Sequence, residues 1–190
     1  MTTRETYHHG DLRTALIAEG LRRLESAGTD LSLRALAKSI GVSPNAPYRH
    51  FANRSKLMGA LAAEGFHRFA DVIVVAGQEP KPLAALKSLG LAYLDFAQNQ
   101  PALYRLMFSP YGYSLDSSAC KAEADRAFGA LVGAIARASE SGWKTGHAVL
   151  TLALAYWAVL HGWAGLSGDR LMPPGVAEAS WGDLLEVYLA

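Results

Sequence analysis

The sequence predicts an all-α protein in which a short helical domain precedes a larger helical bundle. Two observations predict this class. Apolar residues recur at helical spacing along the 190-residue chain, and no convincing alternation of apolar and polar residues indicates a strand. Glycine and proline interrupt the pattern at intervals, so it divides into several separate helices.

The composition is that of a globular protein with an uneven charge distribution. Hydrophobic residues make up 51% of the chain and charged residues 18%, with a formal net charge of +1. These values exclude a disordered chain, a histone-like tail and a strongly acidic protein. Residues 1–70, however, hold ten Lys and Arg against six Asp and Glu, whereas residues 71–190 hold eight against eleven. A basic N-terminal third is typical of a nucleic-acid-binding head.

Two short helices joined by a tight turn are predicted within this basic region. The first has Ser32 as its N-cap and ends at Gly41, and the second starts with Ser43 as N-cap and Pro44 as its first helical residue. Ala37 is small enough to let the two helices approach, and Gly41 supplies a positive φ angle. This register is typical of a helix-turn-helix. The alternative is an αα-corner with only a structural role.

The other elements are helices separated by breaks. A helix before the turn stops at Gly28, and a further helix starts at 53–55. After a break at 77–82 we expect helices at 83–98, 101–108, 119–141 and 145–166, a loop at 109–118, and a last amphipathic stretch at 181–189. The domains are therefore predicted as a helix-turn-helix domain at 1–55, a connecting helix at 56–77 and a bundle at 78–190.

Polar side chains of the short helix after the turn suit a DNA groove. Asparagine can pair with adenine and arginine with guanine in the major groove, so Asn45 and Arg49 suit base edges, whereas the hydroxyl of Tyr48 suits a phosphate oxygen. Arg54 and Lys56 stand at a helix N-terminus, where the dipole disfavours cations, so an anion is expected there. The predicted DNA-binding residues are Ser32, Ser43, Pro44, Asn45, Ala46, Tyr48, Arg49, His50, Arg54 and Lys56.

From Leu31 to Leu57 the sequence LSLRALAKSIGVSPNAPYRHFANRSKL resembles the DNA-binding domain of the tetracycline-repressor (TetR) family of bacterial transcription regulators. The resemblance implies that Tyr48 and His50 contact phosphates and that Arg49 faces bases or backbone. Arg54 stands where lysine is usual in the family, a change that keeps the charge and alters the donor geometry.

The later part of the chain resembles a C-terminal domain type of that family named for a Trp-His-Gly pattern. The matching segments are 100–108 and 157–163, although the order here is His161-Gly162-Trp163 with Trp157 one turn earlier. The domain type is therefore implied, without individual residue roles. The implied architecture is an N-terminal three-helix DNA-binding domain with a helix-turn-helix, followed by a helical-bundle ligand-binding and dimerisation domain.

An uncharged segment at 145–168 bears on membranes and on dimers. Its continuously apolar part, 148–160, is short for a bilayer crossing, so we expect a buried helix in a cytoplasmic protein without membrane contact. It also has more apolar surface than one small bundle can cover, and Gly129 and Gly133 let helices approach closely. One recognition helix reads too few base pairs to find a site in a genome, so a homodimer is expected.

The bundle contains many aromatic residues and few charges. Most of the aromatic residues are expected to fill the core, but a subset suits a cavity for a small, largely apolar effector. The candidate ligand-binding residues are Tyr93, Phe96, Tyr104, Met107, Phe108, Trp157 and His161.

These observations favour a ligand-responsive transcriptional regulator, in the first place a repressor, that binds a palindromic double-stranded DNA operator. No enzyme is expected, because the chain has no Gly-x-Ser-x-Gly elbow, Gly-rich phosphate loop or His-Glu-x-x-His motif. A single cysteine, Cys120, excludes a four-cysteine zinc site, and no metal or cofactor is expected. The alternative is a helical small-molecule-binding protein or enzyme whose N-terminal corner is only structural.

Overall fold

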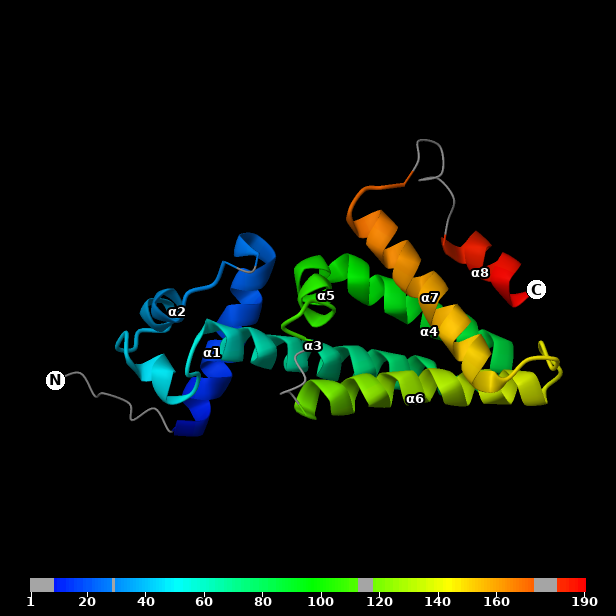
Figure 1. The fold of residues 1–190 in the computed structure, drawn as a ribbon, viewed down its shortest axis with the longest axis horizontal. Coiled ribbons are helices and arrows are strands. Elements are labelled where there is room, and N and C mark those ends of the chain that lie inside the picture. The colour runs from blue at the N-terminus through cyan, green and yellow to red at the C-terminus, as the bar shows by residue number, and fades with distance from the viewer. Residues whose placement is uncertain (1–8, 29, 113–117, 173–180) are drawn as a thin grey trace. The chain divides into compact units, whose positions relative to one another are not determined.

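The computed structural model describes residues 9–28, 30–112, 118–172 and 181–190, and every regular element within these ranges is a helix (Figure 1). The prediction of an all-α fold is confirmed. The elements are α1 (His9–Ala27), α2 (Leu33–Ser39), the 3-10 helix η1 (Ala46–Arg49), α3 (Arg54–Ala76), α4 (Pro82–Asn99), α5 (Pro101–Met107), α6 (Ser118–Glu140), α7 (Val149–Gly168) and α8 (Trp181–Leu189).

The chain divides into two compact units. The first comprises Met1–Gly65 and Ala102–Cys120, and the second comprises Phe66–Pro101 and Lys121–Ala190. Helices α3 and α6 each contribute residues to both units. The helix-turn-helix therefore shares its unit with α5 and the turn that follows α5, which come much later in the sequence.

Leucine side chains from α1, α2 and α3 form the core of the first unit. Leu16, Leu24, Leu36 and Leu61 are fully buried. Gly20 allows α1 and α3 to approach closely, because a Cβ at this position would lie 2.9 Å from Cδ2 of Leu61. The start of α3 is thus packed directly against α1.

The turn after α2 is a Schellman motif built around Gly41. The N–H of Gly41 donates to the carbonyl of Lys38 (3.3 Å), and the N–H of Val42 donates to the carbonyl of Ala37 (3.0 Å). Gly41 has a φ of +75°, in the left-handed region that a glycine adopts without strain. The predicted role of Gly41 is confirmed.

The short helix after this turn differs from the prediction. Ser43 and Pro44 were expected as its N-cap and first helical residue, but the helix is the four-residue η1, Ala46–Arg49, and its N-cap is Asn45. The predicted start is wrong by two residues, and the helix type is 3-10.

Proline chemistry explains the 3-10 geometry of η1. Pro47 has no N–H, so it cannot donate to the carbonyl of Ser43 four residues earlier, as an α-helix requires. Backbone N–H groups donate three residues back instead, from Tyr48 to Asn45 (3.3 Å) and from His50 to Pro47 (2.9 Å). A sequence with proline at this position therefore favours a tight turn of helix.

In the second unit α4 packs against α7 and α8. The hydroxyl of Tyr156 donates to the carbonyl of Leu86 (2.6 Å), and burial raises the pKa of this phenol. Gly90 leaves room for the contact, because a Cβ there would lie 2.5 Å from the Tyr156 hydroxyl oxygen. Trp143, just after α6, donates its indole N–H to the carbonyl of Leu189 (3.0 Å), which fastens α8.

Helix α7 begins at Val149, four residues after the predicted start at Thr145. The backbone is left-handed at Gly142 (φ +102°) and Lys144 (φ +46°), before the predicted start, and turns continue past it, since the N–H of His147 donates to the carbonyl of Lys144 (3.2 Å). Ala148 is extended and serves as the N-cap. The residues between α6 and α7 therefore form turns, which hydrophobic periodicity does not reveal.

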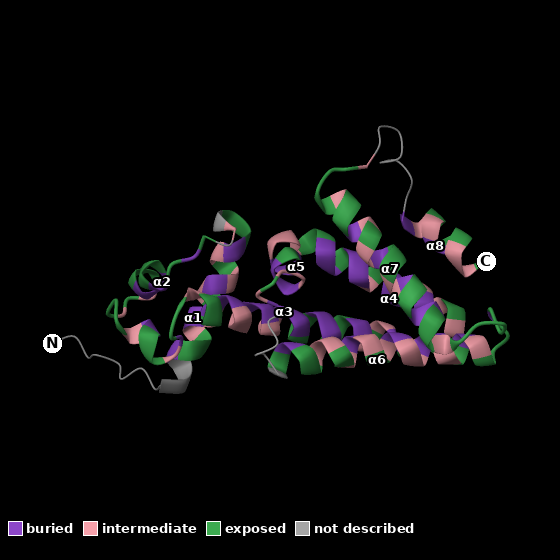
Figure 2. Ribbon diagram, in the orientation of Figure 1, coloured by how far each residue is buried: buried purple, intermediate pink, exposed green. Residues whose placement is uncertain are grey.

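One side of α7 is open in the single chain, so the prediction of a buried helix is wrong for the protomer alone. Leu150, Leu154, Val159 and Leu166 are between 40% and 55% exposed, and Figure 2 colours much of α7 as exposed. By length and apolar composition alone, α7 is also the one helix of the described residues that suffices to cross a membrane. A helix that is apolar on all sides carries no pattern that separates its covered face from its uncovered face.

Candidate DNA interface and ligand site

The predicted DNA-binding residues around η1 mostly face solvent. Ser43, Pro44, Asn45, Tyr48 and Arg49 are exposed. Two others, Ala46 and His50, are half-buried. Tyr48 leaves 44% of its surface open to solvent although it is aromatic. The segment therefore presents an amide, a phenol and a guanidinium on one short stretch of backbone, which are the groups that read base edges and phosphates.

Two buried residues, Pro47 and Phe51, anchor the side of η1 that faces the core. Pro47 is buried within η1, and Phe51, just after it, leaves only 2% of its surface exposed. The N–H of Phe51 donates to the carbonyl of Pro47 (2.9 Å). The guanidinium of Arg13 in α1 lies over the ring of Phe51, 5.5 Å from its centroid. These contacts fix the buried side of η1 and leave the side with Tyr48 and Arg49 open.

Ser32 occupies the predicted N-cap position of α2, with an extended backbone. Its carbonyl accepts the N–H of Leu36 (3.0 Å), but its side chain makes no capping hydrogen bond. The Ser32 hydroxyl is exposed. The position was thus predicted correctly, whereas the side-chain contact that normally accompanies it is missing.

A polar cluster that the sequence analysis missed joins α1 to α2. The carboxylate of Glu19 accepts hydrogen bonds from Arg22 and Arg23 on its own helix and from the hydroxyl of Ser39 at the end of α2. The hydrogen bond from Arg22, with those from Ser39 and Arg23, holds the pKa of Glu19 far below its usual range. Spacing on one helix predicts the arginine contacts, but nothing local predicts Ser39.

Two predicted anion-binding residues at the start of α3, Arg54 and Lys56, differ in how far they are exposed. The side-chain oxygen of Asn53 accepts the N–H of Lys56 (3.0 Å), which caps the helix, and the Lys56 side chain is exposed. Arg54 is half-buried. Its guanidinium donates to the carbonyl of Leu31 (3.2 Å) and to the hydroxyl of Tyr111 (3.2 Å). The Lys56 side chain is therefore exposed at the surface, whereas Arg54 is half-buried and bonded within its own unit.

Four of the candidate ligand-binding residues lie in the second unit, on α4 and α7. Tyr93 is hydrogen-bonded to His161, with 2.9 Å between the hydroxyl oxygen and Nδ1. Trp157 lies one turn before His161, and their rings are 5.7 Å apart. Phe69 of α3, which the sequence analysis did not single out, stacks edge-on against both Tyr93 and Phe96, at 5.1 and 5.2 Å. Burial lowers the pKa of His161, so its imidazole is neutral near pH 7.

The other three candidates, Tyr104, Met107 and Phe108, belong to the first unit, on α5 and directly after it. The rings of Tyr104 and Phe108 are 4.9 Å apart. Met107 is fully buried against Gly65 of α3, where a Cβ would lie 2.8 Å from its Cγ. The seven candidate residues therefore fall into two groups, one in each unit.

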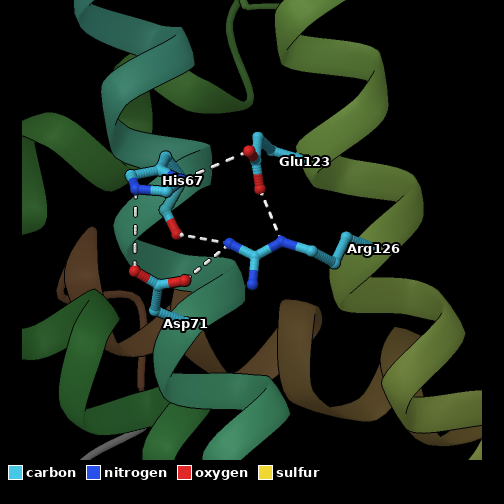
Figure 3. A network of polar contacts seen from close by, with 4 residues as sticks. All are labelled: His67, Asp71, Glu123 and Arg126. Carbon is cyan, nitrogen blue, oxygen red and sulfur yellow. Dashed lines mark hydrogen bonds and ion pairs between the residues drawn. The ribbon is translucent and has the colours of Figure 1, made fainter.

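A second polar cluster joins α3 to α6 in the second unit (Figure 3). Arg126 donates to Glu123 (2.7 Å), to Asp71 (2.6 Å) and to the carbonyl of His67 (3.2 Å). The His67 ring lies 3.2 Å from Glu123. The hydrogen bonds from Arg126 lower the pKa of both carboxyl groups. Only the spacing of Glu123 and Arg126 on one helix is visible in the sequence.

Comparison with known proteins gives a family and several full-length structural relatives. A family model described as "Tetracyclin repressor-like, C-terminal domain" matches residues 86–188, more than half of the chain. A solved structure of a protein of unknown function from Rhodococcus sp. RHA1 is 29% identical, covers 98% of this chain and 97% of that one, and superposes with a TM-score of 0.82.

Two curated relatives match over shorter stretches. The nucleoid occlusion factor SlmA of Marinomonas sp. (strain MWYL1) is 30% identical over 99 residues, 51% of this chain and 50% of that protein. The uncharacterized HTH-type transcriptional regulator YobS of Bacillus subtilis (strain 168) is 34% identical over 74 residues, 39% of each chain. The matches thus span half or less of these two relatives.

Proposed function

Since this chain belongs to the tetracycline-repressor (TetR) family, we propose that it is a ligand-responsive repressor that binds a palindromic DNA operator as a homodimer. The observation that carries the proposal is the exposed polar face of η1, with Asn45, Tyr48 and Arg49, set on the buried Pro47 and Phe51. The expectation that the chain is not an enzyme is confirmed by its membership of a family of regulators.

In the proposed complex, η1 and its flanking residues enter the major groove. Asn45 and Arg49 read base edges there, and Tyr48 contacts a phosphate oxygen. The exposed hydroxyl groups of Ser32 and Ser43 suit neighbouring phosphates, and the exposed ammonium group of Lys56 suits another. Pro44, Ala46 and His50 complete the proposed surface.

The open face of α7 is the proposed dimer interface. Its exposed leucine and valine side chains make an uncharged apolar strip on a helix of 20 residues. On α6, Gly129 and Gly133 have no atom within 4 Å of an ideal Cβ, so another helix can approach closely there. A second copy of the chain covers the strip, which removes it from water without any lipid. The dimer is thus proposed as a cytoplasmic protein.

The proposed effector site is the aromatic group of α3, α4 and α7 in the second unit. Tyr93, Phe96 and Trp157 offer apolar surface, and the Tyr93–His161 pair offers one polar contact, which suits a small, largely apolar molecule. Tyr104, Met107 and Phe108, on α5 and directly after it in the first unit, remain candidates. In this proposal the dimer has one conformer that fits the operator and another that does not. The effector weakens DNA binding only as far as its affinity differs between these two conformers. We propose that helix α3, which contributes residues to both units, transmits the effect of effector binding to the helix-turn-helix.

A gel-shift and footprinting experiment with DNA flanking the gene tests the proposal. The wild-type protein is expected to protect a palindromic site with half-sites about one helical turn, or a multiple of it, apart. Tyr48→Ala serves as the matched control and is expected to lose the footprint while keeping its helical content. If the wild type protects no palindrome at low or moderate salt, the chain is a helical binding protein with only a structural corner.

A further inference from the structure

One arginine of α3 touches two other segments of the first unit. Arg54 is the first residue of α3, directly after the helix-turn-helix. Its Nε donates to the carbonyl of Leu31, two residues before α2, and its Nη1 donates to the hydroxyl of Tyr111, both at 3.2 Å. The guanidinium carbon also lies 5.9 Å from the centroid of the Tyr111 ring. Leu31 itself leaves only 3% of its surface exposed.

Tyr111 is held firmly where Arg54 meets it, by a closed turn after α5. The hydroxyl of Ser109 donates to the carbonyl of Leu106 (2.6 Å) and accepts the N–H of Tyr111 (3.2 Å). The N–H of Gly112 donates to the carbonyl of Ser109 (3.0 Å). A Cβ on Gly112 would lie 1.9 Å from the carbonyl oxygen of Met107, so only glycine fits this turn.

Helix α5 is itself fastened to α1 and α3. The carboxylate of Glu25 in α1 accepts the backbone N–H groups of Ala102 (3.3 Å) and Leu103 (3.2 Å), which are otherwise unpartnered in the first turn of a helix. Gly65 of α3 allows Leu103 to come within 2.9 Å of an ideal Cβ. The segment that carries Tyr111 is thus a fixed part of the first unit.

We propose that Arg54 is a positioning residue, which sets the helix-turn-helix against the α5 turn through Leu31 and Tyr111. This inference rests on the proposed DNA binding and changes the role expected for Arg54, which was a phosphate contact. A phosphate contact needs a charge that reaches solvent, as Lys56 has. Arg54 is half-buried and spends the planar fork of its guanidinium on two internal acceptors.

The proposal makes DNA affinity depend on Tyr111, a residue 57 positions after Arg54 and outside the predicted DNA-binding surface. It also predicts that lysine cannot replace Arg54. A lysine keeps the charge, which is what a phosphate requires, but its single ammonium group does not reproduce the two directed hydrogen bonds. The two roles of Arg54 therefore predict opposite results for the same conservative variant.

Operator affinity measured over a series of salt concentrations tests the proposal. Arg54→Lys and Tyr111→Phe are each expected to weaken binding about tenfold, with the same dependence of log K on log salt as the wild type. The double variant is expected to bind no worse than Arg54→Lys alone. Lys56→Ala is the matched control, and losing its phosphate contact makes the slope shallower by about 0.9. Wild-type affinity in both Arg54→Lys and Tyr111→Phe overturns the proposal.

Amide hydrogen exchange of the free protein supplies a test that needs no DNA. Tyr111→Phe is expected to speed exchange in α2. Without the Tyr111 hydroxyl, Arg54 is held less firmly, and so is its hydrogen bond to the Leu31 carbonyl just before α2. Unchanged exchange in α2 overturns the positioning role, even when the operator is bound. A wild-type protein that binds no operator contradicts the proposed function instead, and the exchange result then still decides whether Arg54 and Tyr111 position α2.

Discussion

The hydroxyl of Tyr93 lies 2.9 Å from Nδ1 of His161, so a side-chain hydrogen bond joins α4 to α7 across 68 positions of sequence. The His161 ring is also packed beside Trp157. Burial lowers the pKa of His161. A neutral imidazole can either accept the Tyr93 hydrogen or donate its own, depending on its tautomer. The same pair can therefore meet an effector with either a donor or an acceptor.

The lowered pKa of His161 predicts a loss of stability in mild acid. The folded protein binds this proton less readily than the unfolded chain, whose pKa is near 6.5. The contribution is complete above that value and is lost as the pH falls through the folded-state pKa. His161→Gln keeps a polar partner for Tyr93 and is expected to make the unfolding free energy depend less on pH below about 6.5, the ordinary pKa of histidine. Chemical denaturation measures it, and His147→Gln, at an exposed position, is the control.

Ligand binding is expected to depend on the aromatic group around Tyr93. Compounds from a hydrophobic library that raise the melting temperature of the wild type should have little effect on Trp157→Ala, because this variant removes apolar contact area. Trp163→Phe, on the same helix, is the control. If no compound stabilises the wild type or releases it from DNA, the ligand site is refuted and the DNA-binding assignment stands.

Substitutions on η1 should separate affinity from sequence preference. Tyr48→Ala is expected to weaken binding to all sequences and to make the salt dependence shallower, because a phosphate contact releases counterions. Arg49→Ala is expected to cost about 1–3 kcal/mol at one base position and to relax the preference there. Binding to a library of operator variants at two salt concentrations measures both effects. If Arg49→Ala weakens binding to all operator variants equally, Arg49 contacts the DNA backbone rather than a base.

A charge on the open face of α7 should break the dimer. Leu154→Glu buries an unpaired carboxylate in the proposed interface, which is far more costly than leaving it in water. Sedimentation at micromolar concentration is expected to show the 20.3 kDa protomer for this variant and twice that mass for the wild type. Val75→Glu, at a position of α3 that is 69% exposed, serves as control and should stay dimeric. A monomeric wild type contradicts the interface.

The cluster around Arg126 should stabilise the protein less as the pH drops. Hydrogen bonds from Arg126 lower the pKa values of Asp71 and Glu123, so their contribution is complete above the ordinary values of 3.8 and 4.5 and is lost below them. Arg126→Gln is expected to make the melting temperature depend less on pH in the acidic range. Lys121→Gln, which breaks the exposed pair with Asp125 on the same helix, is the control. An equal dependence on acidic pH for wild type and Arg126→Gln would show that the cluster is not coupled to folding.

Local chemistry made much of the fold predictable. Gly28 and Gly41 end their helices with φ of +58° and +75°, and α3 starts within 53–55, as the sequence indicated. The missing N–H of Pro47, which forbids one specific α-helical hydrogen bond, is a local signal that the prediction did not use. The start of α7 escaped prediction because turns occupy the residues up to the N-cap Ala148, and hydrophobic periodicity does not reveal turns.

The contacts that could not be predicted join residues far apart in sequence. Arg54 is predicted as a phosphate contact because its neighbours in sequence are those of a helix N-terminus, and its internal contacts were not predicted. Its partner Tyr111 lies beyond α4 and α5. Phe69 was overlooked for the same reason, since its stacking partners are on another helix. Periodicity identifies the face of a helix that packs, but not which helix it packs against.

The 3-10 form of η1 also constrains how a new operator could be recognised. Residues three apart in a 3-10 helix are eclipsed, so Ala46 and Arg49 stand in one row along the helix. At about 2.0 Å of rise per residue the two side chains are separated by roughly 6 Å, close to two base-pair steps of about 3.4 Å. A polar side chain in place of Ala46 would therefore stand in the same row as Arg49, and the two would meet the proposed operator together.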